Sequence, residues 1–90
     1  MKAHCLDVSD LAPPEPMSTI LTALAQLPAK HYLKIIHSRI PYPLLTKLDE
    51  NGWNYRYCPK QKSNNHEKIC LFIYRSNDQV EFEAIPEHLL

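Results

Sequence analysis

Apolar side chains are regularly spaced along the first third of the chain, and their spacing changes from that of a strand to that of a helix. Residues 3–8 alternate between two sides, as expected for a strand. From Pro16 onward, apolar residues recur every three or four positions and form one stripe of an amphipathic helix: Met17, Ile20, Leu21, Leu24 and Leu27. Proline is tolerated in a first helical turn, whereas Pro28 lacks a backbone N–H and ends the helix.

A second strand and a second helix follow with the same signals. Residues 32–37 alternate between two faces and are predicted to form a strand. Pro41 and Pro43 then begin a helix, whose apolar side consists of Leu44, Leu45 and Leu48. We expect this helix to end at Asn51 and Gly52, because both residue types tolerate the left-handed backbone of a helix C-terminus.

Two further strands are predicted in the second half. Residues 53–58 are rich in aromatic side chains, and residues 68–75 are β-branched and apolar. The polar stretch 59–67 between them is expected to be a mobile loop. The resulting βαβαββ order predicts an α/β fold, namely an α+β two-layer sandwich with two helices on one face of a four-stranded mixed sheet, since crossovers between parallel strands are normally right-handed.

The last fifteen residues have a different pattern from the rest. We therefore divide the chain into a domain over residues 1–75 and a C-terminal extension over residues 76–90. The alternation of Val80, Phe82 and Ala84 suggests an extra edge strand. The sheet face opposite the helices would otherwise be uncovered and could serve self-association or a partner domain. We favour the alternative in which the extension folds over that face and buries Phe82 and Ile85.

Charge and length restrict the function classes. The chain has 90 residues, with ten basic and ten acidic residues scattered along it, so its net charge is zero. There is no basic stripe for nucleic acid and no polybasic run for a membrane surface, and we expect neither as a partner. No apolar run approaches the roughly 20 residues that span a bilayer, and the N-terminus lacks the apolar core of a signal peptide. We expect a small cytoplasmic protein.

The three cysteines, Cys5, Cys58 and Cys70, are odd in number and lack C-x-x-C spacing. This pattern fits reduced thiols better than a disulfide framework, and we interpret Cys58 and Cys70 as small apolar fillers of the last strands. A zinc or copper site from Cys58, His66 and Cys70 would have C-x7-H-x3-C spacing, which matches no common tetrahedral framework. We predict no metal and no cofactor.

The two strand-to-helix turns are the best candidate site. Because the strands that precede them are expected to be parallel, both turns should lie at the same end of the sheet. Helix N-termini expose unpaired amide donors and carry partial positive charge, so two of them together could hold a small anion or a partner's carboxylate. The candidate binding residues are Pro13, Pro14, Glu15, Pro16, His37, Arg39 and Pro41.

A purely structural interpretation of these turns has equal weight. Glu15 would satisfy its own helix start, pair with Arg39 and lock the two turns together. His37 could be an acid, a base or a ligand, but a hydrogen-bonded structural histidine is the favoured interpretation. General acid–base chemistry needs a second group, and Glu15 is the sole nearby carboxylate. We identify no catalytic residue, and the chain is more typical of a binding protein than of an enzyme.

The first turn also resembles a known signature. Sulfur carriers of the TusA/SirA-like family open with L-D-x-x-G-L-x-C-P-x-P, and this chain has Pro13 where the reactive cysteine stands in that motif. A TusA-like group known as a domain of unknown function carries P-P-E-P there and a later H-x-R-x-P, and both occur here, at residues 13–16 and 37–41. The resemblance covers roughly residues 5–75 and implies the same fold.

The resemblance implies a small TusA-like binding or regulatory module that lacks the sulfur-carrier cysteine. It also implies a protein partner in a redox, hemerythrin-like or respiratory setting. One alternative is a sulfur-relay protein in which Cys5 replaces the lost thiol, although Cys5 lies within the first strand and faces away from the helices. Another is an anion- or metabolite-binding domain centred on Glu15, His37 and Arg39. The oligomeric state is left open.

Overall fold

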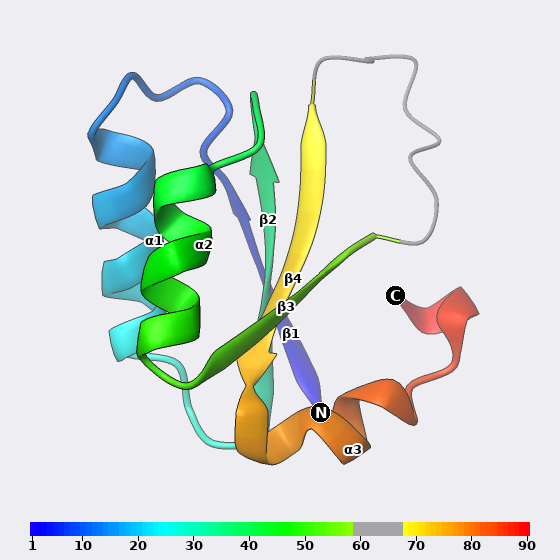
Figure 1. The fold of residues 1–90 in the computed structure, drawn as a ribbon. Coiled ribbons are helices and arrows are strands. Elements are labelled where there is room, and N and C mark those ends of the chain that lie inside the picture. Colours follow the sequence, from blue (N-terminus) through cyan, green and yellow to red (C-terminus); the bar gives the residue numbers. More distant parts are fainter. Residues whose placement is uncertain (59–67) are drawn as a thin grey trace.

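The chain folds into a four-stranded mixed sheet with helices on one face and a helical tail against the other (Figure 1). The computed structural model describes residues 1–58 and 68–90, so the predicted loop over residues 59–67 lies outside the described part. The main elements are β1 (Lys2–Asp7), α1 (Glu15–Ala25), β2 (His31–His37), α2 (Tyr42–Glu50), β3 (Trp53–Tyr57) and β4 (Ile69–Arg75). The tail contains η1 (Ser76–Asp78), α3 (Gln79–Glu83) and η2 (Glu87–Leu89).

The strand order in the sheet is β1-β2-β4-β3. Strand β1 pairs with β2 in parallel, in a register that runs from Lys2 opposite His31 to Asp7 opposite Ile36. Strand β4 is antiparallel to both β2 and β3. Helices α1 and α2 lie together on one face of this sheet (Figure 1). The predicted sandwich of two helices on a four-stranded mixed sheet is therefore confirmed.

The layer between sheet and helices is the larger part of the core. Helix α1 contributes Ile20 and Leu24, helix α2 contributes Leu44 and Leu48, and all four side chains are buried. Their partners in this cluster are Val8, Leu27, Leu33, Ile35, Leu71 and Ile73. Burying an aliphatic side chain of this size contributes roughly 1.5–3 kcal/mol of hydrophobic free energy, so this layer holds the two helices against the sheet.

The opposite face of the sheet carries a second cluster, which the tail completes. Tyr32, Phe72 and Tyr74 alternate onto this face, and Phe82 of α3 covers them with no exposed surface. The predicted edge strand through Val80 and Phe82 is wrong, because residues 79–83 form a short helix. A strand would have placed both side chains on one face, whereas Val80 is 77% exposed and Phe82 is fully buried. The prediction that the tail covers this face is confirmed, with Phe82 buried as expected and Ile85 only partly buried against the cluster.

Candidate functional site

The two strand-to-helix turns lie at one end of the sheet (Figure 1). Strand β1 stays paired with β2 up to its last residue, Asp7 opposite Ile36, and just beyond it the Val8 backbone N–H donates a hydrogen bond of 2.9 Å to the Ile36 carbonyl oxygen. Each strand then leads into its helix through residues 8–14 or 38–41. The parallel pairing therefore places both helix starts at the same end of the molecule, as the order of elements led us to expect.

The candidate residues divide into an exposed and a buried set. Pro13, Pro14, Glu15 and Arg39 are exposed, whereas Pro16, His37 and Pro41 are buried. The buried prolines are part of the helix starts, so they shape the turns and offer little surface to a ligand. Contact with a partner at this end therefore depends on the exposed set.

His37 is a buried and hydrogen-bonded residue at the end of β2. Its Nδ1 accepts a hydrogen bond of 3.2 Å from the backbone N–H of Arg39, and the side chain is held at 7% exposure. Burial lowers the pKa of His37, and the nearby Arg39 charge lowers it further. A neutral ring that accepts at Nδ1 carries its proton on Nε2. His37 thus fixes the second turn, in agreement with the structural role that we favoured from the sequence.

The expected ion pair between Glu15 and Arg39 is not formed. Within residues 1–58 and 68–90, the ion pairs are those of Lys30 with Asp78 and with Glu81. Glu15 lies in the first turn of α1, where a carboxylate interacts favourably with the partial positive charge of the helix. The two turns are held by the sheet and by the packing of their helices, and the two exposed charges are not paired with each other.

Prolines remove most of the amide donors from the start of α1. Pro14 precedes the helix without a side-chain cap, and Pro16 has no N–H. The Glu15 N–H donates to the Ala12 carbonyl oxygen at 2.9 Å. Among the described residues, this leaves the Met17 N–H as the one amide of the first turn without an acceptor.

The start of α2 repeats this arrangement. Pro41 and Pro43 lack N–H groups, and the Tyr42 N–H donates to the Ile40 carbonyl oxygen at 3.1 Å. In this first turn of α2, only the Leu44 N–H lacks an acceptor among the described residues, and the Leu44 side chain is buried. Each helix therefore offers one amide donor where an ordinary N-terminus offers up to four. This is a poor cradle for a small anion.

Tyr42 is a residue of this end that the sequence reasoning missed. It stands between the two prolines of α2 and is 67% exposed. Together with Pro13, Pro14 and Arg39 from the exposed set, Tyr42 forms what we call the turn surface. The signal was present in the sequence as an aromatic residue at the second position of a P-x-P helix start, a position that the apolar stripe of the helix does not include.

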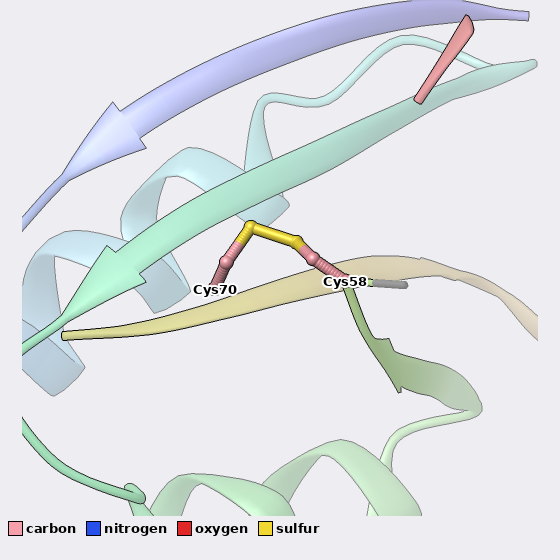
Figure 2. The surroundings of a disulfide bond; sticks show 2 residues. All are labelled: Cys58 and Cys70. Atoms are coloured by element: carbon pink, nitrogen blue, oxygen red, sulfur yellow. A yellow bond between two sulfur atoms is a disulfide. The ribbon is translucent and has the colours of Figure 1, made fainter. Parts of the chain in front are cut away.

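The prediction of reduced, unpaired thiols is wrong for Cys58 and Cys70. Figure 2 shows a disulfide between them, with Cys58 directly after β3 and Cys70 near the beginning of β4. Their Cα atoms are 5.4 Å apart, because the antiparallel pairing of β3 and β4 continues to Cys58, whose N–H donates to the Cys70 carbonyl oxygen. Cys5 is a free and exposed cysteine on β1.

No group of three or more potential metal ligands comes together within residues 1–58 and 68–90. His66, the imidazole of the site that we considered from the sequence, lies outside the described residues. In the same part of the chain, no helix has the length and apolar character needed to cross a bilayer.

Residues 5–67, well over half of the chain, match the model of a family described as uncharacterized conserved protein (DUF2249). The matched range begins in β1 and ends in the stretch before β4, so it contains both strand-to-helix turns. Searches of curated proteins and of solved structures gave no match. The chain belongs to this family of uncharacterized conserved proteins.

Proposed function

We propose that this protein is a binding module that engages a protein partner through the turn surface. The observation that carries the proposal is the composition of that surface. It presents the rigid rings of Pro13 and Pro14, the exposed ring of Tyr42 and the charge of Arg39, which has no ion-pair partner within residues 1–58 and 68–90, at one end of the sheet. Tyrosine and arginine are enriched among the residues that contribute most to protein–protein affinity.

A protein ligand fits this surface better than a free anion. In the first turns of the two helices, only the Met17 and Leu44 amides lack acceptors among the described residues, so these helix starts offer a small anion little beyond the Arg39 charge. A partner chain can place a carboxylate on Arg39 and at the same time cover Tyr42 and the prolines. The preferred partner is therefore a protein that presents a carboxylate beside an apolar patch.

The resemblance to TusA-like sulfur carriers is the second support. In those carriers a cysteine at the helix start is activated by the positive helix end, which favours its thiolate. Here the corresponding residue is Pro13, which is exposed and has no sulfur. The proposed module keeps a carrier-like arrangement of turns while the nucleophile of that chemistry is missing. Partners of a redox or respiratory kind remain the expectation that this resemblance provides.

The test compares the wild-type chain with Tyr42→Ala and Arg39→Ala. Each immobilised protein is exposed to native cell extract, the bound proteins are identified, and the affinity of a purified candidate is then measured. We expect each substitution to weaken binding at least tenfold, or about 1.4 kcal/mol. Val80→Ala is the matched control, since Val80 is 77% exposed on α3, at the other end of the sheet in Figure 1. Equal binding by all variants would refute the proposal.

Phosphate, sulfate and acetate are tested in parallel by thermal unfolding. A ligand that binds only the native state raises its apparent stability, and the effect saturates with concentration. We expect no saturable stabilisation by these anions. A saturable rise in the unfolding temperature that disappears in Arg39→Ala would show that a small anion, and not a protein, is the ligand of this end.

A sulfur-relay function that uses Cys5 is the second candidate. It is favoured by one observation: Cys5 is exposed and lies outside the Cys58–Cys70 disulfide. Incubation with a persulfide donor and intact mass measurement test this function. A stoichiometric sulfur adduct that is lost in Cys5→Ser would support the relay, whereas an unmodified Cys5 would exclude it.

A further inference from the structure

We infer that the Cys58–Cys70 disulfide is a thiol–disulfide exchange site, at which an external thiol attacks the sulfur of Cys58. The bond lies on the sheet face that the tail covers, because Cys70 alternates onto the same face as Phe72 and Tyr74. It occupies the end of the β3–β4 ladder, beyond Tyr57 opposite Leu71 (Figure 2). This activity is separate from binding at the turn surface.

The two sulfur-bearing residues differ in accessibility. Cys70 belongs to β4, which has neighbouring strands on both sides, and is only 8% exposed. Cys58 follows the last residue of the edge strand β3 and is partly exposed, although it packs against the second cluster, which Phe82 of the tail completes. Exchange requires a thiolate to reach one sulfur of the bond. The arrangement selects Cys58 as the sulfur attacked and Cys70 as the leaving thiolate.

Two cations lie on the same sheet face, in the row of residues next to this bond. Lys34 and Arg56 are the two strand neighbours of Phe72 in the register, and Arg56 precedes Cys58 by two residues. The Lys34 ammonium is 5.9 Å from the Phe72 ring centroid, and the Arg56 guanidinium is 5.6 Å from that of Phe82. Reactive cysteines usually lie in partly exposed, electropositive surroundings, because nearby positive charge favours the thiolate over the thiol. The cations also attract an anionic thiol.

Cys5 is not the attacking thiol. It lies on the same face, but two strands across and two residues along from Cys70, which places their Cα atoms roughly 12 Å apart. Cysteines whose Cα atoms are more than about 7 Å apart do not bridge without movement of the backbone. The thiol must therefore come from another molecule, either a low-molecular-weight thiol or a protein thiol.

The exchange has two steps. A thiolate forms a bond to Cys58 Sγ, the Sγ–Sγ bond breaks, and Cys70 leaves as a thiolate that takes up a proton. A second thiolate then attacks the external sulfur of the mixed disulfide and releases Cys58. Two thiols lose two electrons and become a disulfide, while Cys58 and Cys70 gain both electrons and two protons. The reverse reaction restores the bond at the expense of an external disulfide.

The sequence led us to expect a cytoplasmic protein, and disulfides in that compartment are usually catalytic or redox-sensing. A disulfide whose role is purely structural would react with thiols only after the whole domain has unfolded. An exchange site opens in the folded protein. The dependence of the opening rate on denaturant distinguishes the two, because global unfolding accelerates steeply with urea, whereas attack on an accessible sulfur does not.

The experiment uses the full chain with Cys5→Ser, so that the two remaining cysteines are read alone. The protein is incubated with reduced glutathione in zero and in low, non-denaturing urea, quenched with acid and alkylated, and its mass and peptides are measured. We expect opening at a rate that is nearly independent of urea, with the transient glutathione adduct on Cys58. An opening rate that rises steeply with urea, or an adduct on Cys70, would overturn the inference.

Four further variants test the direction of attack and the role of the cations. Oxidised glutathione should modify Cys58 in Cys70→Ser and leave Cys70 unmodified in Cys58→Ser, and the opposite pattern would contradict the assignment. Replacing Lys34 or Arg56 by Gln should slow opening by anionic glutathione about threefold for each charge removed, as expected for unit charges about 7 Å apart in water. Opening by mercaptoethanol, whose attacking thiolate carries no charge beyond that of its sulfur, should change less, and equal slowing by both thiols would refute the role of the cations.

Discussion

Phe82 of the tail lies almost parallel to the ring of Tyr74 in β4, with ring centroids 4.1 Å apart and ring planes inclined by 11°. The same ring meets Tyr32 edge-on at 5.1 Å. Stacked and edge-to-face arrangements are both favourable for aromatic pairs. One side chain of a five-residue helix therefore closes a sheet face that would otherwise expose a patch of aromatic rings.

Replacing Phe82 by Ala should lower the free energy of unfolding by about 3–5 kcal/mol, because it removes a fully buried aromatic ring and leaves a cavity between the tail and the sheet. Urea denaturation followed by circular dichroism measures this loss. Val80→Ala is the control on the same helix and should change stability by less than about 0.5 kcal/mol, since Val80 points into solvent. A similar effect of both substitutions would show that the tail does not cover the sheet.

Much of this fold could be predicted from the sequence, because its main core depends on spacing alone. The stripe that includes Ile20 and Leu24 identifies the buried side of α1, and the parallel pairing of β1 and β2 follows from the order of elements. The tail could not be assigned in this way. Of its three apolar positions Val80, Phe82 and Ala84, only Phe82 is buried. So short a pattern does not distinguish a strand from a helical turn.

The disulfide and the state of the turns depended on information that spacing does not contain. Whether Cys58 meets Cys70 is decided by the register of β3 on β4, which the spacing of residues along the chain does not fix. The Glu15–Arg39 pair was predicted from topology alone. It is not formed, because the proximity of two turns does not fix where two long exposed side chains lie. The burial of His37 was predictable, since it ends a strand of the core.

The Cys58–Cys70 bond should also stabilise the folded chain. It joins residues 12 positions apart in sequence. Constraining a loop of this size in the unfolded chain is worth about 3 kcal/mol in the chain-entropy model. We expect the double variant Cys58→Ala and Cys70→Ala to unfold at correspondingly lower urea concentration. Cys5→Ser, which changes an exposed position, should leave the midpoint nearly unchanged. Equal stability of the double variant and the wild type would contradict this expectation.

Stability should fall as the solution becomes acidic, and two histidines contribute to the fall. Burial lowers the pKa of His37 in the folded state below its ordinary value of 6.5, and desolvation together with the neighbouring His4 does the same for His31. The unfolded chain therefore takes up protons first as pH drops below about 6.5, which favours unfolding until the folded-state pKa values are passed. Above about pH 6.5 these two histidines do not change the pH dependence of the free energy of unfolding.

Urea denaturation at several values between pH 8 and about pH 5 measures this dependence. The variant His37→Asn can keep a hydrogen-bond acceptor near the position of Nδ1, which receives the Arg39 N–H, but it does not titrate. His31→Gln removes the partner of His4, whose Nε2 lies 2.7 Å from His31 Nδ1. Each variant should show a smaller loss of stability on acidification than the wild type. An unchanged pH dependence in both variants would assign the effect to other groups.

Arg75, the last residue of β4, connects three elements and provides the last prediction. Its guanidinium lies 4.9 Å from the Trp53 ring centroid and donates hydrogen bonds to the carbonyl oxygens of Pro28, at 3.0 Å, and Leu27. Those carbonyls follow the end of α1, so one side chain ties this helix to the edge strand β3. A lysine has a single ammonium group and cannot reproduce the planar fork or the stacking.

Arg75→Lys should therefore lower the free energy of unfolding by about 1–2 kcal/mol, the size expected for losing a charge-assisted hydrogen bond and a stacked contact. Because Trp53 is the single tryptophan of the chain, its fluorescence reports directly on the loss of the stacked guanidinium. Lys30, which is 63% exposed and pairs with Asp78 at 3.2 Å, offers a comparison. Lys30→Arg keeps the charge and should leave the Trp53 emission unchanged. A shifted emission in that variant, or an unshifted one in Arg75→Lys, would show that Trp53 does not sense the Arg75 contact.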